Sequence, residues 1–221
     1  MRLKFWRQSN DTPLEPLWHV QLAVVVALVL YLLLPDKLII GPRWIVPTLE
    51  ALLLVGLVSV TPQKLLYESH NRRVLAISLA GLITLANIAS LVLLVHFLLT
   101  GGKTDGHQLI LSSIEIYLTN IIIFGLWYWE LDRGGPGKRS HLNNNDADFL
   151  FPQMTTPDLA PKHWYPTFVD YLYVSATNAT AFSPTDTMPL SRQAKLLMLT
   201  QSFVSLVTIA LVAARAVNIL S

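Results

Sequence analysis

Five long apolar stretches constrain this chain more than any other feature of its sequence. They begin near His19, Trp44, Val74, Gln108 and Leu196, and each is about 17–26 residues long. A helix of that length crosses a hydrocarbon layer ~30 Å thick, because it rises ~1.5 Å per residue. A helix of a soluble protein needs only one apolar stripe, so five such stretches predict an integral membrane protein.

Composition agrees with a membrane protein and excludes several function classes. The chain of 221 residues is 52% hydrophobic and 14% charged, whereas soluble domains carry about 25% charged residues. Its net charge of +2, without a basic stripe of interleaved aromatic residues, predicts no nucleic-acid partner. The absence of cysteine excludes thiolate metal sites and cysteine nucleophiles.

The sequence contains no motif that predicts an enzyme. It has no H-E-x-x-H, P-loop, G-x-S-x-G or G-x-G-x-x-G pattern, each of which would supply a recognisable catalytic or cofactor site. No two of the 6 histidines lie three or four residues apart, the spacing that a two-histidine metal site on a helix requires. We therefore expect no catalytic residue, metal site or cofactor, and an enzyme ranks third among the classes considered.

The loops between the apolar stretches divide the chain into four parts. Residues 1–16 form an N-terminal segment, 17–130 a four-helix transmembrane part, 131–165 a polar loop and 166–221 the C-terminal part. The apolar group Phe149–Phe151 predicts that the polar loop is partly ordered against the membrane face. The expected spans are Leu17–Leu34, Trp44–Val60, Val74–Leu99, His107–Trp129 and Leu196–Leu220.

The segment Pro166–Pro189 does not read as an ordinary span. It begins apolar and aromatic but breaks up into small polar residues after Val174, so it is either a re-entrant half-helix with a loop or a poor sixth span. Lipid offers no hydrogen-bond partners for the backbone N–H and C=O groups of such an irregular segment. We expect a helix over Phe168–Ala176 that stops part-way and a return over Thr177–Pro189. The fold class is thus an all-α membrane protein with five transmembrane helices and one re-entrant half-helix.

Lysine and arginine in the loops predict the orientation, because they are enriched on the cytoplasmic side. If Pro166–Pro189 re-enters, Arg192 and Lys195 lie on the cytoplasmic side, which then has twelve basic residues against three on the opposite side. If this segment is a sixth span, the two sides have ten and five basic residues. Charge therefore favours re-entry and a cytoplasmic N-terminus. Ten basic residues lie on one side (Arg2, Lys4, Arg7, Lys64, Arg72, Arg73, Arg133, Lys138, Arg139, Lys162) and three on the other (Lys37, Arg43, Lys103).

The chain after Pro166 has a characteristic order of elements. It contains a short helix, a run of threonines and small residues, an aspartate, a proline, and then a basic residue that opens a final apolar helix. This order resembles the pore loop and inner helix of tetrameric cation channels. The resemblance implies a pore helix at Phe168–Ala176, a filter at Thr177–Ser183 and an inner helix at Leu196–Leu220. A potassium filter needs glycines so that successive carbonyls face the axis. The residues 180–184, TAFSP, have none, so no potassium-type filter is expected. The implied pathway residues are Thr177, Asn178, Thr180, Phe182, Ser183, Thr185 and Asp186.

Several longer motifs carry a second resemblance. WYWELDRGGP, DFLFPQM, FVDYLYVSATNATAFSPTDTMPLSRQAK and the ending VAARAVNIL are similar to a group of uncharacterised bacterial inner-membrane proteins. That similarity covers the C-terminal half. It implies the bacterial cytoplasmic (inner) membrane as the location, and it brings no activity with it.

Ionisable residues within spans are costly and usually face partners or water. Glu50 and Arg215 lie ~9 Å below the outer boundary and Glu115 ~12 Å below it at ~1.5 Å per residue, with His96 shallower. We therefore expect an intramembrane polar cluster of Glu50, His96, Glu115, Arg215 and Asn218, in which Arg215 reaches a glutamate. The cluster is either a proton or ion relay or polar glue between helices. The alternative is that Arg215 extends outward alone and that Glu50 is protonated or hydrated.

The preferred functional hypothesis is a small pore-loop-type ion channel or permeation protein. It requires a homo-oligomer surrounded by membrane lipids, because one helix pair cannot enclose water, and small cations are the candidate permeants. The competing hypothesis is a non-conducting membrane protein that acts as a structural, lipid-interacting or partner-interacting component.

Overall fold

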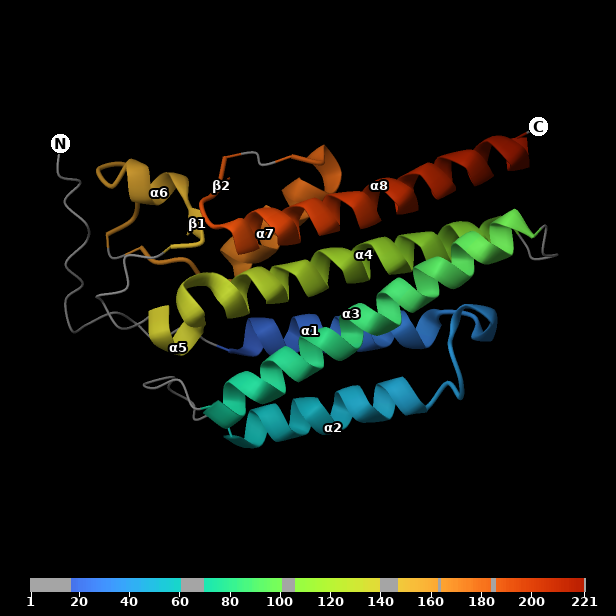
Figure 1. Cartoon of the computed structure of the whole chain (residues 1–221), viewed down its shortest axis with the longest axis horizontal. Coiled ribbons are helices and arrows are strands. Elements are labelled where there is room, and N and C mark those ends of the chain that lie inside the picture. Colours follow the sequence, from blue (N-terminus) through green and yellow to red (C-terminus); the bar gives the residue numbers. More distant parts are fainter. Residues whose placement is uncertain are drawn as a thin grey trace.

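The protein is a bundle of long helices that run side by side along one axis (Figure 1). A computed structural model describes residues 17–60, 70–100, 106–139, 147–162, 164–183 and 186–220, with the side chains of residues 60, 106 and 215–220 not included. The long helices are α1 (Trp18–Leu33), α2 (Ile45–Val60), α3 (His70–Leu99), α4 (Gly106–Leu131) and α8 (Arg192–Leu220).

Three helices in the described part of the chain are long and apolar enough to cross a membrane. They occupy His70–Leu99, His107–Gly134 and Arg192–Ala214, with 30, 28 and 23 residues. The helices α1 and α2 are apolar but have only 16 residues each. The structure thus confirms a helical protein with three candidate membrane spans.

The first helix ends where the sequence predicts. Leu34 precedes Pro35 and adopts an extended backbone, with φ −58° and ψ 141°, because the proline ring disfavours helical conformation in the preceding residue. A short 3₁₀ turn, η1 (Asp36–Leu38), follows. The side chain of Arg43 bridges this turn to α1, since it donates to the carboxylate of Asp36 and to the carbonyl of Leu32.

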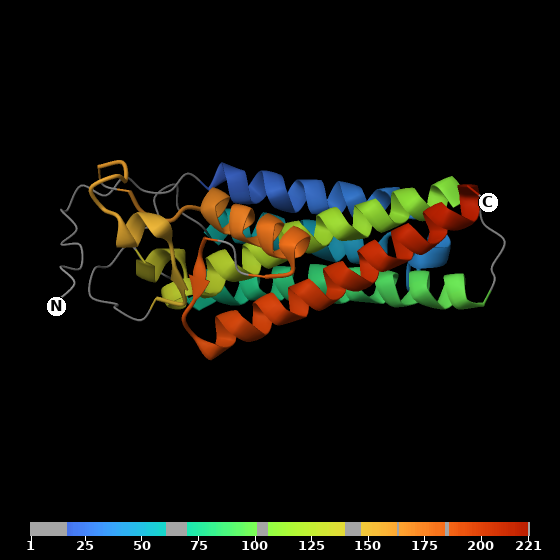
Figure 2. The ribbon, with the colours of Figure 1, turned by 90° about the horizontal axis from the view of Figure 1, so that it is seen from above.

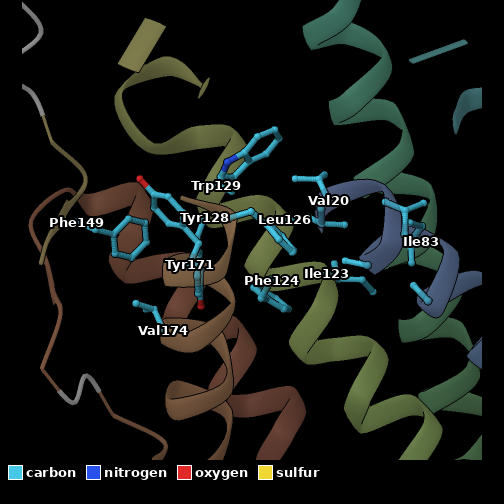
Figure 3. Close-up of a cluster of buried hydrophobic side chains, with 14 of the residues drawn as sticks. Val20, Ile83, Ile123, Phe124, Leu126, Tyr128, Trp129, Phe149, Tyr171 and Val174 are labelled. Atoms are coloured by element: carbon cyan, nitrogen blue, oxygen red, sulfur yellow. The ribbon is translucent and has the colours of Figure 1, made fainter. Parts of the chain in front are cut away.

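Helix α4 is the centre of the bundle. It packs against α1, α3, α7 and α8, and it supplies half of the labelled side chains in the buried cluster of Figure 3. Tyr128 is completely buried there, with Trp129 and Phe124 beside it and Tyr171 from the neighbouring α7. Bulky aromatic side chains on α4 thus hold the surrounding helices together.

The polar loop is partly ordered, as its apolar residues predict. It forms η2 (Asp132–Gly134), α5 (Pro136–Arg139), β1 (Phe149–Leu150) and α6 (Pro152–Thr155). Phe149 and Phe151 are buried, with 1% and 3% of their surface exposed. Strand β1 pairs antiparallel with β2 (Met188–Pro189), with Phe149 opposite Pro189. This pairing ties the loop to the segment that precedes α8.

Helix α7 (Phe168–Ala181) stops part-way along the bundle (Figure 2). It begins with a capping box, in which Thr167 and Asp170 satisfy each other's backbone groups. It ends at Phe182, whose backbone is left-handed with φ 55°. The chain then returns to β2, beside β1, and α8 starts from that same end. The helix thus stops part-way along the bundle, whereas its re-entry into a membrane stays a prediction.

The helix is longer than expected, and this corrects the implied filter. Thr177, Asn178 and Thr180 are helical instead of extended. The hydroxyl of Thr177 donates to the carbonyl of Tyr173 at 2.9 Å, and that of Thr180 to the carbonyl of Ala176 at 2.8 Å. Small polar residues that suggested a loop thus satisfy their hydroxyls within one more turn of helix.

The contact between α4 and α7 depends on Gly125. A Cβ atom at this position would lie 3.2 Å from Leu172 Cα and 3.3 Å from Leu172 Cδ1. We predict that Gly125→Ala destabilises the protein by about 1–3 kcal/mol, because the backbone of α7 cannot move away without losing its other contacts. The measurement is the midpoint of unfolding in detergent. The matched control is Gly81→Ala on α3, where nothing lies within 4 Å; it should gain up to about 1 kcal/mol from helix propensity. Equal effects of the two changes would contradict the close approach.

Candidate functional site

A fully buried hydrogen-bond network joins α4, α7 and α8. We call Tyr128, Ser175, Asn178 and Gln201 the polar seam. The Tyr128 hydroxyl donates to Gln201 Oε1 at 2.5 Å, and Asn178 Nδ2 donates to the same oxygen at 2.9 Å. Gln201 Nε2 donates to the carbonyl of Ser175 at 2.9 Å and to its Oγ at 2.6 Å. The amide of Gln201 thus uses both its oxygen and its nitrogen to hold α7 between the two longer helices.

One residue of the polar seam, Asn178, is a residue that the channel resemblance places in a filter. Asn178 is 2% exposed. Its Nδ2 donates to the carbonyl of Met198 at 3.0 Å, and Ser202 donates to its Oδ1 at 3.3 Å. This residue therefore packs against α8 and does not face a pathway in the described chain.

The remaining filter-like residues surround the tip of α7. Thr180, Phe182, Ser183 and Asp186 are exposed, and Thr177 is half-buried. Thr185 lies outside the described residues. The hydroxyl of Thr180 lies 3.2 Å from that of Tyr117, which is close to the middle of α4 (Gly106–Leu131). The tip therefore exposes polar side chains about half-way along the central helix.

A buried ion pair lies at the end of the bundle where α7 begins. Arg72 Nη2 donates to Glu130 Oε1 at 2.8 Å, and Nη1 lies 3.4 Å from Oε2. Both side chains are only 3% exposed. The Arg72 guanidinium also lies 5.9 Å from the centre of the Trp129 ring. This bidentate ion pair holds the start of α3 against the end of α4.

A second group of charges surrounds Asp132, which is completely buried. Its carboxylate accepts from the Tyr171 hydroxyl and from the backbone N–H of Asp148. The Tyr171 hydroxyl is therefore the hydrogen-bond donor and the Asp132 carboxylate the acceptor. The Arg139 guanidinium lies 4.9 Å from the centre of the Tyr171 ring and donates to the carbonyl of Asp132 at 3.2 Å.

These contacts bring together three segments that are distant in the sequence. Asp132 comes from WYWELDRGGP, Asp148 directly precedes the apolar part of DFLFPQM, and Tyr171 comes from FVDYLY. The tight turn between them has left-handed backbone at Arg133 (φ 54°), Gly134 (φ 77°) and Gly135 (φ 107°). These three motifs carry a resemblance in sequence, but no sequence pattern predicted the contacts between them. The sequence signal for these contacts is that an aspartate lies beside aromatic residues in each of the three motifs.

The expected intramembrane polar cluster does not form among the described side chains. Glu50 is 1% exposed and neither of its oxygens has a hydrogen-bond partner there. Glu115 is half-buried with its Oε2 unpartnered, and His96 is exposed. No hydrogen bond or ion pair within the described residues joins these three. The side chains of Arg215 and Asn218 lie outside the described residues, so the pairing of Arg215 with a glutamate stays a prediction.

Within the described part of the chain, no group of three or more histidine, cysteine, aspartate or glutamate side chains could hold a metal ion. Comparisons with known proteins bring no further assignment. No protein-family model matches the chain, and neither a curated protein nor a solved structure matches it.

Proposed function

We propose that α1, α2, α3, α4 and α8 span the bacterial cytoplasmic membrane, and that α7 is a re-entrant half-helix inserted from the cytoplasmic side. The exposed side chains of α2 support its place in lipid, since Leu52 and Val55 are 64% and 66% exposed. At 16 residues each, α1 and α2 are ~24 Å long at ~1.5 Å per residue, and local thinning of the bilayer accommodates such a mismatch. The excess of basic residues puts the N-terminus in the cytoplasm.

We further propose that the protein is a small oligomeric permeation protein of the pore-loop type. The observation that carries this is the exposed tip of α7, where Thr180 lies level with the middle of α4 and the exposed Phe182 and Ser183 follow it in the chain. Lipid cannot satisfy the polar groups of an irregular segment at that depth, so protein or water must cover them. A homo-oligomer that gathers several tips around one axis would provide both.

Small cations are the permeants that fit this tip. The C-terminal end of a helix carries a partial negative charge from its unpaired carbonyls, and half-helix ends of this kind coordinate cations within membranes. Asp186 is exposed in the return segment and adds a carboxylate. No potassium preference is expected, because TAFSP has no glycine and the helix continues to Ala181.

A non-conducting role is the alternative, and the polar seam favours it. Asn178 and Gln201 satisfy each other within one chain, as a purely structural re-entrant helix would require. In that case a partner protein or lipid headgroup would cover the tip. Copies of the same chain arranged around an axis would not be needed.

Ion flux into liposomes tests the proposal. We expect purified wild-type protein to pass small cations, and Asp186→Asn to reduce the preference for cations over anions several-fold, because it removes a charge beside the tip. The control is Asp158→Asn, the same chemical change at an exposed position in the loop after α6, which should leave selectivity unchanged. Absence of flux from a protein that is monomeric by native mass spectrometry would support the non-conducting alternative instead.

A further inference from the structure

Glu50 is an isolated acid inside the bundle. It is the only ionisable residue of α2 (Ile45–Val60). Its side chain is 1% exposed, and both carboxyl oxygens are buried without a hydrogen-bond partner among the described residues. Buried carboxylates are normally paired with a cation or bonded to several donors. Glu50 has neither.

Within the described chain, the two helices that pack most closely against α2 bring no counter-charge to Glu50. These are α3 and α1. Helix α3 has no ionisable residue from Val74 to Val95, and its His96 is exposed. Helix α1 offers Tyr31, which is 6% exposed and lies within electrostatic reach of Glu50. The other ionisable residue of α1, His19, lies at the opposite end of that helix.

The charged residues of the connection before α2 are engaged elsewhere. Arg43 donates to Asp36 at 3.1 Å and to the carbonyl of Leu32. The ammonium group of Lys37 lies 5.4 Å from the centre of the Phe97 ring. These contacts hold the two cations around η1, and neither cation is a hydrogen-bond partner of the Glu50 carboxyl.

An ionised carboxylate in such a place is strongly unfavourable, because the lost hydration is not replaced. The neutral acid avoids this loss. We propose that Glu50 is a proton-binding site within the membrane layer, held as the carboxylic acid at neutral pH. The ligand is the proton itself, and the site is independent of the proposed permeation pathway at the tip of α7.

A buried neutral acid has a diagnostic reaction with an apolar carbodiimide such as dicyclohexylcarbodiimide. The acid proton moves to one carbodiimide nitrogen, and a carboxyl oxygen bonds to the central carbon to give an O-acylisourea. The acyl group then shifts from oxygen to nitrogen and forms a stable N-acylurea. Nothing leaves and no other reagent is consumed, so the protein gains the mass of one carbodiimide. An ionised carboxylate does not supply the proton for the first step.

Labelling of the full chain in liposomes tests the proposal. We expect dicyclohexylcarbodiimide to add one molecule on the peptide that contains Glu50, at a rate that falls as the pH is raised. Glu50→Gln should abolish this adduct, whereas Glu115→Gln should leave it. A water-soluble carbodiimide should label exposed carboxyls such as Asp158 and spare Glu50. Failure to label Glu50 while other carboxyls react, or a rate independent of pH, would overturn the proposal.

Two further measurements do not depend on reagent access. Glu50→Gln replaces a neutral acid by a neutral amide of the same shape, so it should keep the unfolding midpoint of the wild type. It should also remove an infrared carbonyl band of a protonated carboxyl that wild-type protein shows. An unfolding midpoint lowered by many degrees, or the absence of that band from the wild type, would show instead that Glu50 is ionised and paired.

Discussion

Arg72→Met should destabilise the protein by about 3–5 kcal/mol, because it leaves the buried carboxylate of Glu130 without its cation. Both side chains of this pair are 3% exposed, and two guanidinium nitrogens face the two carboxylate oxygens. Water cannot replace the lost arginine at that depth. Methionine keeps much of the side-chain volume, so the effect reports the charge. The measurement is unfolding by denaturant in mixed micelles.

A double substitution and an exposed ion pair provide the controls. Arg72→Met combined with Glu130→Leu should recover a large part of the loss, because no unpaired charge then remains buried. Arg43→Met removes an ion pair whose side chains are 45% and 80% exposed, and exposed pairs contribute about 1 kcal/mol or less. If Arg72→Met and Arg43→Met had equal effects, the buried pair would not stabilise the end of the bundle.

Gln201→Leu should release α7 from its place between α4 and α8. The substitution removes the acceptor for the Tyr128 hydroxyl and for Asn178 Nδ2, and the donor to the Ser175 carbonyl. Each buried polar group left unsatisfied costs about 1–3 kcal/mol. We therefore expect a lower unfolding midpoint and faster hydrogen exchange at the amides of α7 than at those of α3, measured by mass spectrometry.

The neighbouring residue gives a matched control. Thr200 is exposed on the same helix, and its hydroxyl bonds only to the carbonyl of Leu196 within α8. Thr200→Val should therefore leave the midpoint and the exchange of α7 close to those of the wild type. Unchanged exchange in Gln201→Leu would show that apolar packing alone, around Phe168 and Val174, is enough to hold the half-helix.

The long helices and most of their ends follow from the sequence. A continuous apolar run forms a helix wherever lipid or a buried core excludes other hydrogen-bond partners for the backbone. The run Val74–Leu99 accordingly lies within α3 (His70–Leu99), and the end of α1 follows from Pro35. The partial order of the polar loop also followed from its pattern, because Phe149 and Phe151 are buried wherever the chain provides a core.

Only the tertiary structure decided the candidate sites, because their partners are distant in the chain. Arg72 and Glu130 are 58 residues apart, and Tyr128 and Gln201 are 73 apart. No local pattern specifies which charges or amides will meet across helices. The extra turn of α7 has the same origin, since the contact of Asn178 with α8 stabilises a helix that its own sequence interrupts. The isolation of Glu50 likewise depends on the rotation of α2 against α1 and α3, which depth along the membrane does not fix.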